Sequence, residues 1–156
     1  MSASKKQFDD LAMALFKKFA RFEYALKVTS FHCGNGKANS DWQKFSRSIQ
    51  GFFEKSENNE LRSAIQYFLD HPPKKQVIRN NQIDWEEANP GSKIPEELIL
   101  LYVRRVRNNL FHGGKFHGHW VEPQRDINLL KYSLVILDAC LQASNDVREA
   151  FKQDSY

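Results

Sequence analysis

The sequence predicts an all-α protein, an up-down bundle of four to five helices with a short irregular or hairpin insertion around residues 76–88. Hydrophobic residues recur every three or four positions over long stretches, which is the spacing of a helix with one buried face. The 7 glycines and 5 prolines gather in a few places, so the regular elements are long and their connections short. At 156 residues the chain has the length of one domain. We therefore expect a single helical domain over residues 1–156.

The first two helices are predicted on either side of a glycine loop. The first spans about residues 5–30 and ends before Gly34-Asn35-Gly36. Its apolar stripe consists of Phe8, Leu11, Leu15, Phe19, Phe22 and Leu26. The second opens at Ser40, because Gln43 three residues later completes a capping box. Its apolar side is formed by Trp42, Phe45, Ile49, Phe52 and Phe53.

A third, shorter helix is expected over about residues 58–70, where Pro72-Pro73 stop it. Its inward side chains are Leu61, Ile65, Phe68 and Leu69. The segment from Gln76 to Trp85 departs from helical spacing. Apolar pairs flank Asn80-Asn81 there, which suits either a small hairpin or an irregular insertion.

Two further helices complete the bundle. Pro95 at a first helical position, with acidic residues directly after it, starts the fourth helix, and Gly113-Gly114 ends it. The last helix begins at Pro123 and runs to about residue 150. The stripes of the two helices are Ile99, Val103, Val106 and Leu110, and then Ile127, Leu130, Leu134, Leu137 and Leu141.

Charge and cysteine content narrow the class of protein. A net charge of +4 and a pI near 9.1 favour anionic partners such as nucleic acid or acidic proteins, although so small an excess also suits simple solubility. Cys33 and Cys140 show no CxxC spacing. The chain lacks a secretory pattern and any apolar run long enough for a membrane span. We expect a cytoplasmic protein that does not enter a membrane.

The segment from Val106 to Lys115 indicates a catalytic site. In it Arg107 and His112 are separated by four residues, and Asn108 follows the arginine. Residues five apart on a regular helix diverge by about 140°. Gly113-Gly114 would let the last turn open and bring the imidazole toward the guanidinium. A histidine exchanges protons near neutral pH, as a general acid or base must.

Arg-Asn-Asn-Leu-Phe-His-Gly-Gly-Lys, residues 107–115, resembles the R-polar-x3-H motif, also written Rx4-6H, of the HEPN superfamily. The first helix, with Phe19 and the run Phe22-Glu23-Tyr24-Ala25-Leu26-Lys27, is similar to helices that precede this motif in such proteins. The architectural resemblance covers the whole chain, and its specific part is about ten residues. One HEPN toxin branch has tyrosine two residues after the histidine. Gly114 stands there in this chain, so control by modification of that tyrosine is not supported.

The resemblance implies a homodimer whose two motifs face each other across the twofold axis and cleave RNA without a metal ion. His112 would move protons at the ribose 2′-hydroxyl or the leaving 5′-oxygen, and Arg107 would neutralise the charge on phosphorus. Asn108 would orient the pair or bind the phosphate. The products would carry a 2′,3′-cyclic phosphate. Such a ribonuclease would serve as a toxin or antiviral effector, and an antitoxin or regulatory protein would be a further partner.

Other residues near the motif admit both functional and ordinary interpretations. Arg104, Arg105 and Lys115 are candidates to bind RNA phosphates, although each also suits a contact with acidic side chains or solvent. His112, His117 and His119 gather in sequence with no nearby cysteine and one close carboxylate, so we expect neither metal nor cofactor. Glu23 is either a partner of an active-site arginine or a partly exposed glutamate. Tyr24, Trp42 and Trp120 could stack on bases, but packing in the core or a dimer is favoured.

Two other functions stay open beside the ribonuclease. One is a non-catalytic HEPN module that dimerises and binds a nucleotide, RNA or a partner protein. The other is a helical scaffold without a site. An intact motif favours catalysis without proving it.

Overall fold

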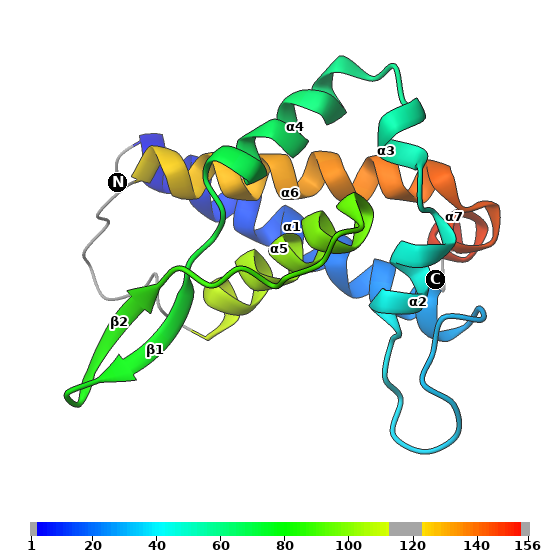
Figure 1. Cartoon of the computed structure of the whole chain (residues 1–156), viewed down its shortest axis with the longest axis horizontal. Helices are drawn as coiled ribbons and strands as arrows, with labels where there is room; N and C mark the ends of the chain where they lie inside the picture. The colour runs from blue at the N-terminus through cyan, green and yellow to red at the C-terminus, as the bar shows by residue number, and fades with distance from the viewer. Residues whose placement is uncertain (1–2, 113–122, 154–156) are drawn as a thin grey trace.

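A computed structural model describes residues 3–112 and 123–153, which form seven helices and one antiparallel hairpin (Figure 1). The predicted mostly helical fold with a hairpin insertion is confirmed. Counted over these residues, the helices exceed the predicted four to five, because two of the predicted helices are each divided. The elements are α1 Ala3–Lys27, α2 Trp42–Ser48, α3 Phe52–Lys55, α4 Asn59–Asp70, β1 Lys75–Arg79, β2 Gln82–Glu86, α5 Pro95–Phe111, α6 Pro123–Ala143 and α7 Asn145–Lys152.

Helix α6 is the centre of the bundle and packs against α1, α4, α5 and α7. Figure 1 shows it running the length of the molecule, with α4 along its upper side and most of α1 and α5 along its lower side. The predicted stripes supply most of the core, although Leu69 is about half exposed, contrary to expectation. The largest fully buried side chains include Phe22, Phe45, Phe68, Leu15, Leu26, Ile99, Ile136 and Leu137.

The predicted second helix differs from the structure at both ends. Its N-cap is Asp41, whose carboxylate accepts a hydrogen bond from the Lys44 backbone N–H at 2.9 Å. The expected cap, Ser40, directs its hydroxyl to another partner described below. At Gly51 the backbone turns left-handed, with φ of 92°, a conformation that glycine adopts without steric cost. This turn separates α2 from α3.

The insertion is a hairpin whose register pairs Lys75 with Glu86 and Ile78 with Ile83. Asn80 and Asn81 form its turn with φ of 53° and 61°, the positive values of a two-residue type I′ turn. Asparagine tolerates these values better than other side chains do. Ile78 and Ile83 therefore face each other next to the turn, whereas Val77 pairs with Asp84 and Trp85 with Gln76.

The C-terminal helix is also divided. Helix α6 begins at Pro123 as predicted but ends at Ala143, and Ser144 caps α7 by accepting a hydrogen bond from the Val147 N–H. Buried Val147 and Ala150 return α7 to the core, where it packs against α1 and α6. Among the helices of the described residues, none has the length and apolarity needed to cross a membrane.

Candidate functional site

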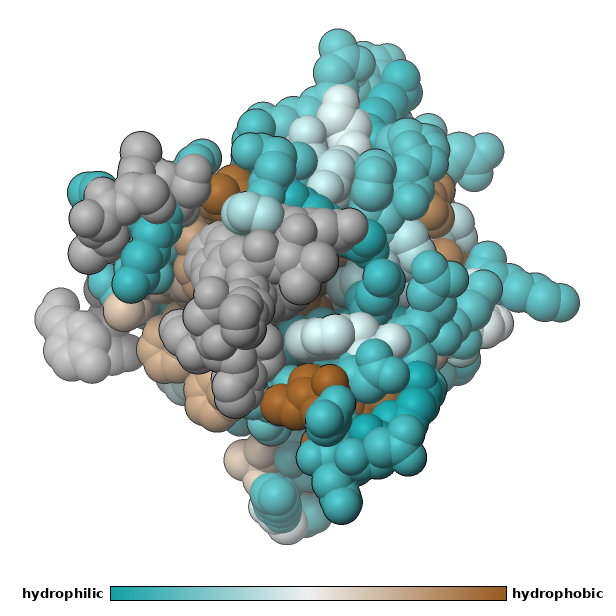
Figure 2. All heavy atoms as spheres, turned by 90° about the vertical axis from the view of Figure 1, so that its left-hand side faces the viewer, coloured by the Kyte–Doolittle hydropathy of each residue, from teal (hydrophilic) through white to brown (hydrophobic). Residues whose placement is uncertain are grey.

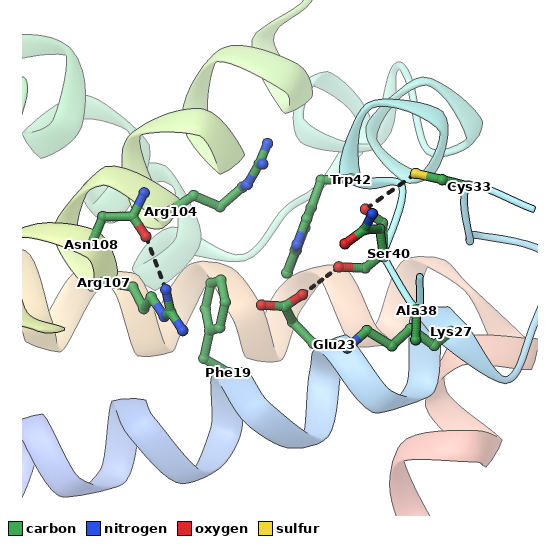
Figure 3. A pocket seen from close by; sticks show the side chains of 11 residues that line it. Phe19, Glu23, Lys27, Cys33, Ala38, Ser40, Trp42, Arg104, Arg107 and Asn108 are labelled. Atoms are coloured by element: carbon green, nitrogen blue, oxygen red, sulfur yellow. Dashed lines mark hydrogen bonds between the residues drawn. The ribbon is translucent and has the colours of Figure 1, made fainter. Parts of the chain in front are cut away.

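Three side chains of the predicted motif region line one cavity of about 450 Å³. Arg104, Arg107 and Asn108 lie three and four residues apart on α5, so they share one face of the helix. Helix α1 and the segment after it form the remaining walls (Figure 3). These walls consist of Phe19, Glu23, Lys27, Cys33, Ala38, Asn39, Ser40 and Trp42.

Arg107 is held in place by an amide and two aromatic rings. Its Nη1 donates to Asn108 Oδ1 at 3.0 Å. Its guanidinium carbon lies 5.3 Å from the centre of the Phe19 ring and 4.7 Å from that of Phe111. Both distances are within cation–π range. These contacts fix the orientation of a permanently charged group at the cavity wall.

Arg104 occupies the same cavity without a comparable anchor. Its guanidinium carbon lies 5.9 Å from the centre of the Trp42 ring, and Trp42 is itself buried. Burial lowers the pKa of Arg104 below its ordinary value, and the charge of Glu23 opposes that shift. No hydrogen-bond acceptor for its guanidinium occurs among the residues that the structure describes.

Glu23 faces the cavity from α1 and accepts a hydrogen bond from the Ser40 hydroxyl through Oε2 (Figure 3). Ser40 closes the loop that follows α1, since His32 pairs with it and the Cys33 N–H donates to Asn39 O at 3.0 Å. Helix α1 thereby holds one end of the glycine loop against the cavity. Glu23 is partly exposed, and its hydrogen-bond partner among the described residues is Ser40 and not an arginine.

His112 lies outside the cavity. It caps α5, and its backbone N–H still donates to Asn108 O at 2.9 Å. The expected opening of the last turn therefore does not occur at this residue. The imidazole is exposed and meets the edge of the Phe111 ring, with ring centres 6.2 Å apart. Within one chain, Arg107 and His112 end on different sides of a regular helix.

Arg105 has a different role from its neighbours. Its Nη1 donates to Pro73 O at 3.2 Å and to Ala88 O at 2.7 Å, and these carbonyls stand before and after the hairpin. Arg105 thus fastens the base of the hairpin to α5 and does not line the cavity. These bonds give Arg105 a structural role, and its assignment as an RNA-binding residue stays a prediction.

Lys115, Gly113-Gly114, His117, His119 and Trp120 lie outside the described residues, so the predictions made for them are not addressed. In the described ranges, 3–112 and 123–153, no three His, Cys, Asp or Glu side chains form a group suited to a metal ion.

Sequence reasoning did not single out Lys27, Asn39 or Ser40 as site residues. One signal was available, because Phe19, Glu23 and Lys27 recur every four residues and so share one face of α1. The contribution of the loop has no such signal, since it depends on how residues 28–41 fold back onto α1. Comparison with known protein families, with curated proteins and with solved structures finds no match for this chain.

Proposed function

We propose that the protein is a metal-independent endoribonuclease whose active site is completed in a homodimer. The observation that carries the proposal is the Arg107–Asn108 pair, hydrogen-bonded on the wall of a cavity with three cationic side chains and one carboxylate. His112 is exposed at the end of the same helix. A fixed guanidinium and an exposed imidazole can together catalyse metal-free RNA cleavage, as charge stabiliser and proton-transfer group.

In this mechanism the ribose 2′-oxygen attacks the adjacent phosphorus while the bond from phosphorus to the 5′-oxygen breaks. His112 accepts the 2′-hydroxyl proton and, once protonated, donates a proton to the leaving 5′-oxygen. Arg107 neutralises the negative charge that grows on the phosphoryl oxygens. The products are a 2′,3′-cyclic phosphate and a 5′-hydroxyl, and DNA is inert because it lacks the nucleophile.

The outer face of α1 supports the dimer. Met13, Phe16 and Tyr24, with Ala20 between the last two, are spaced three and four residues apart and lie on one face. The three large side chains are each more than half exposed, as is Phe111 at the end of α5. This face adjoins the Phe19–Glu23–Lys27 row of the cavity. Burying such a stripe against a second copy would place two cavities and two α5 ends together.

The proposal is tested by incubating purified protein with RNA in EDTA, beside Arg107→Ala and His112→Ala. Each substitution should lower the cleavage rate by roughly 100-fold or more, as the loss of a charge-stabilising or proton-transfer group does. Arg148→Ala, on α7 and away from the cavity lining, is the matched control and should cleave normally. A substrate with 2′-deoxyribose at the cleaved position should resist.

Cleavage that persists unchanged in both variants would come from a contaminant and would end the assignment. Loss of activity in the Arg148 control would point to a general effect on folding, which thermal melting of each variant separates from catalysis.

A second candidate function is a non-catalytic dimer that binds a nucleotide or RNA. The observation that favours it is the place of His112, exposed and outside the cavity while the last turn of α5 stays closed. Tight RNA binding without cleavage by the wild-type protein, weakened by Arg107→Ala but not by His112→Ala, would select this function.

A further inference from the structure

We infer that the cavity between α1 and α5 is a nucleobase subsite that selects guanine, with Glu23 and Arg104 as its specificity residues. The inference rests on the proposed function in one respect, that the base belongs to an RNA substrate. Its physical basis is the donor and acceptor pattern of the cavity.

Glu23 makes the cavity unsuitable as a simple phosphate cradle. Three cations line it, Lys27, Arg104 and Arg107, but a carboxylate lies among them, and a carboxylate repels phosphate. Oε2 of Glu23 accepts the Ser40 hydroxyl, whereas Oε1 accepts no hydrogen bond from the described residues. A ligand that fits beside Glu23 must therefore present hydrogen-bond donors at that point, such as the N–H groups of a base.

Arg104, on the α5 wall of the same cavity, requires the opposite pattern in a ligand, because a guanidinium has only hydrogen-bond donors. One side of its guanidinium lies over Trp42 at 5.9 Å, and its N–H groups find no acceptor in the part of the chain that the structure describes. Arg104 is partly buried, and a partly buried guanidinium that lacks protein acceptors has lost some of its hydration at a cost. A ligand that offers acceptor atoms to Arg104 removes this cost.

Guanine presents both patterns side by side. Its N1–H and N2–H₂ are adjacent donors that one carboxylate accepts together, and its O6 and N7 are adjacent acceptors that arginine binds in a bidentate manner. Adenine, cytosine and uracil each place an acceptor where guanine has one of these donors. Glu23 from α1 and Arg104 from α5 both line the cavity, so one ligand ring there can contact both side chains.

The dimensions and surroundings of the cavity agree with a nucleotide. A volume of about 450 Å³ lies within the roughly 300–1,000 Å³ of small-ligand pockets. Lys27, at the far end of the α1 row, and Arg107, on the other side of Phe19 (Figure 3), lie where the phosphates flanking the base would need positive charge. The Arg107 side leads to the proposed cleavage site.

Calorimetric titration with the four nucleoside 5′-monophosphates tests the inference in the full-length wild-type protein. Guanosine monophosphate should bind at least about tenfold more tightly than the other three, as a correct bidentate pair discriminates bases. Inosine monophosphate lacks the N2 amino group and should bind several-fold more weakly than guanosine monophosphate. Equal affinity for all four nucleotides, or binding matched by inorganic phosphate alone, would overturn the inference.

Glu23→Gln should abolish the preference for guanine, because an amide presents one donor where the base also presents donors. Glu60→Gln, an exposed residue of α4, is the matched control and should keep the preference. If Glu23→Gln keeps it as well, Glu23 does not read the base. The inosine comparison in the wild-type protein decides the question if the variant does not fold.

Mapping cleavage sites separates this inference from the proposed function. Cuts beside guanosine support both, and cuts without base preference leave the ribonuclease standing and remove the guanine subsite. Guanine-selective binding without any cleavage supports the subsite and removes the ribonuclease.

Discussion

Arg104, Arg105 and Arg107 differ in role because successive positions on a helix point in different directions. Arg107 is braced between two rings and an amide, Arg105 fastens the hairpin, and Arg104 has no acceptor in the described chain. The sequence distinguished Arg107 through the asparagine beside it. It could not distinguish Arg104 from Arg105, since the acceptors of Arg105 are the carbonyls of Pro73 and Ala88, which only the tertiary fold brings near.

Glu23 shows a different limit of sequence reasoning at this scale. A glutamate beside an apolar stripe is compatible with solvent exposure or with an arginine partner, and local spacing does not decide between them. The direction in which the carboxylate points depends on Ser40, seventeen residues away in the sequence, because the Ser40 hydroxyl donates a hydrogen bond to it. The same contact explains the wrong cap assignment, because Asp41 was free to cap α2 while the Ser40 hydroxyl binds Glu23.

The buried thiol of Cys140 gives a prediction about pH. Burial, together with the negative charge of Glu96, raises the pKa of this thiol well above its ordinary value of 9.0. Above about pH 9 the unfolded chain loses the proton while the folded chain keeps it. Stability should therefore fall by about 1.4 kcal/mol for each pH unit from this group.

Urea denaturation of wild type and Cys140→Ala at pH 8 and at pH 10 measures this slope. The alanine variant is expected to be less stable at both values, because it leaves a cavity, but its stability should decline less between them. An equal decline in both proteins would show that the thiol does not ionise on unfolding in this range.

At the scale of elements, predictions from local pattern were the most accurate. The starts of α5 and α6 follow from proline at the first helical position, and the hairpin follows from paired apolar residues around two asparagines. The breaks at Gly51 and Ser144 were missed because each interrupts a continuous apolar stripe. A stripe with three- and four-residue spacing predicts which side chains are buried. It does not predict where the helix axis changes direction.

Helix α1 has two apolar faces, and the second yields a test of assembly. Phe16→Glu places a charge on the exposed stripe without touching the core, so it should convert a dimer into a monomer. Leu69→Glu, at a similarly exposed position on α4, should leave the dimer intact. Light scattering coupled to size-exclusion chromatography gives the masses.

If wild type and Phe16→Glu have the same mass, this face is not the interface. The monomeric variant is also expected to lose RNA cleavage while it keeps guanosine monophosphate binding, because the cavity is formed within one chain.

At the scale of the whole molecule, the two ends of the described bundle carry different elements on their surfaces. The hairpin and the C-terminal end of α5 lie at the left of Figure 1, and apolar areas interrupt the hydrophilic surface on that face (Figure 2). The glycine loop and α7 lie toward the opposite end. The cavity lies between these regions, and the exposed imidazole is beyond its edge.

This arrangement predicts that cleavage uses Arg107 of one protomer with His112 of the other. Arg107→Ala and His112→Ala are each inactive alone in this scheme. Mixing them under conditions that exchange subunits forms dimers with one intact arginine and one intact histidine in opposite chains. The mixture should regain measurable RNA cleavage, and a mixture that stays inactive after proven exchange would require both groups from one chain.

Cys33 provides a site for chemical labelling at the cavity. Its sulfur lies on the lining and is exposed, whereas the only other thiol of the chain, Cys140, is wholly buried. A maleimide dye added to the native protein will therefore attach at one position, next to the loop that Ser40 fastens. Labelled in this way, the protein reports in real time whether a molecule enters between α1 and α5, without any engineered cysteine.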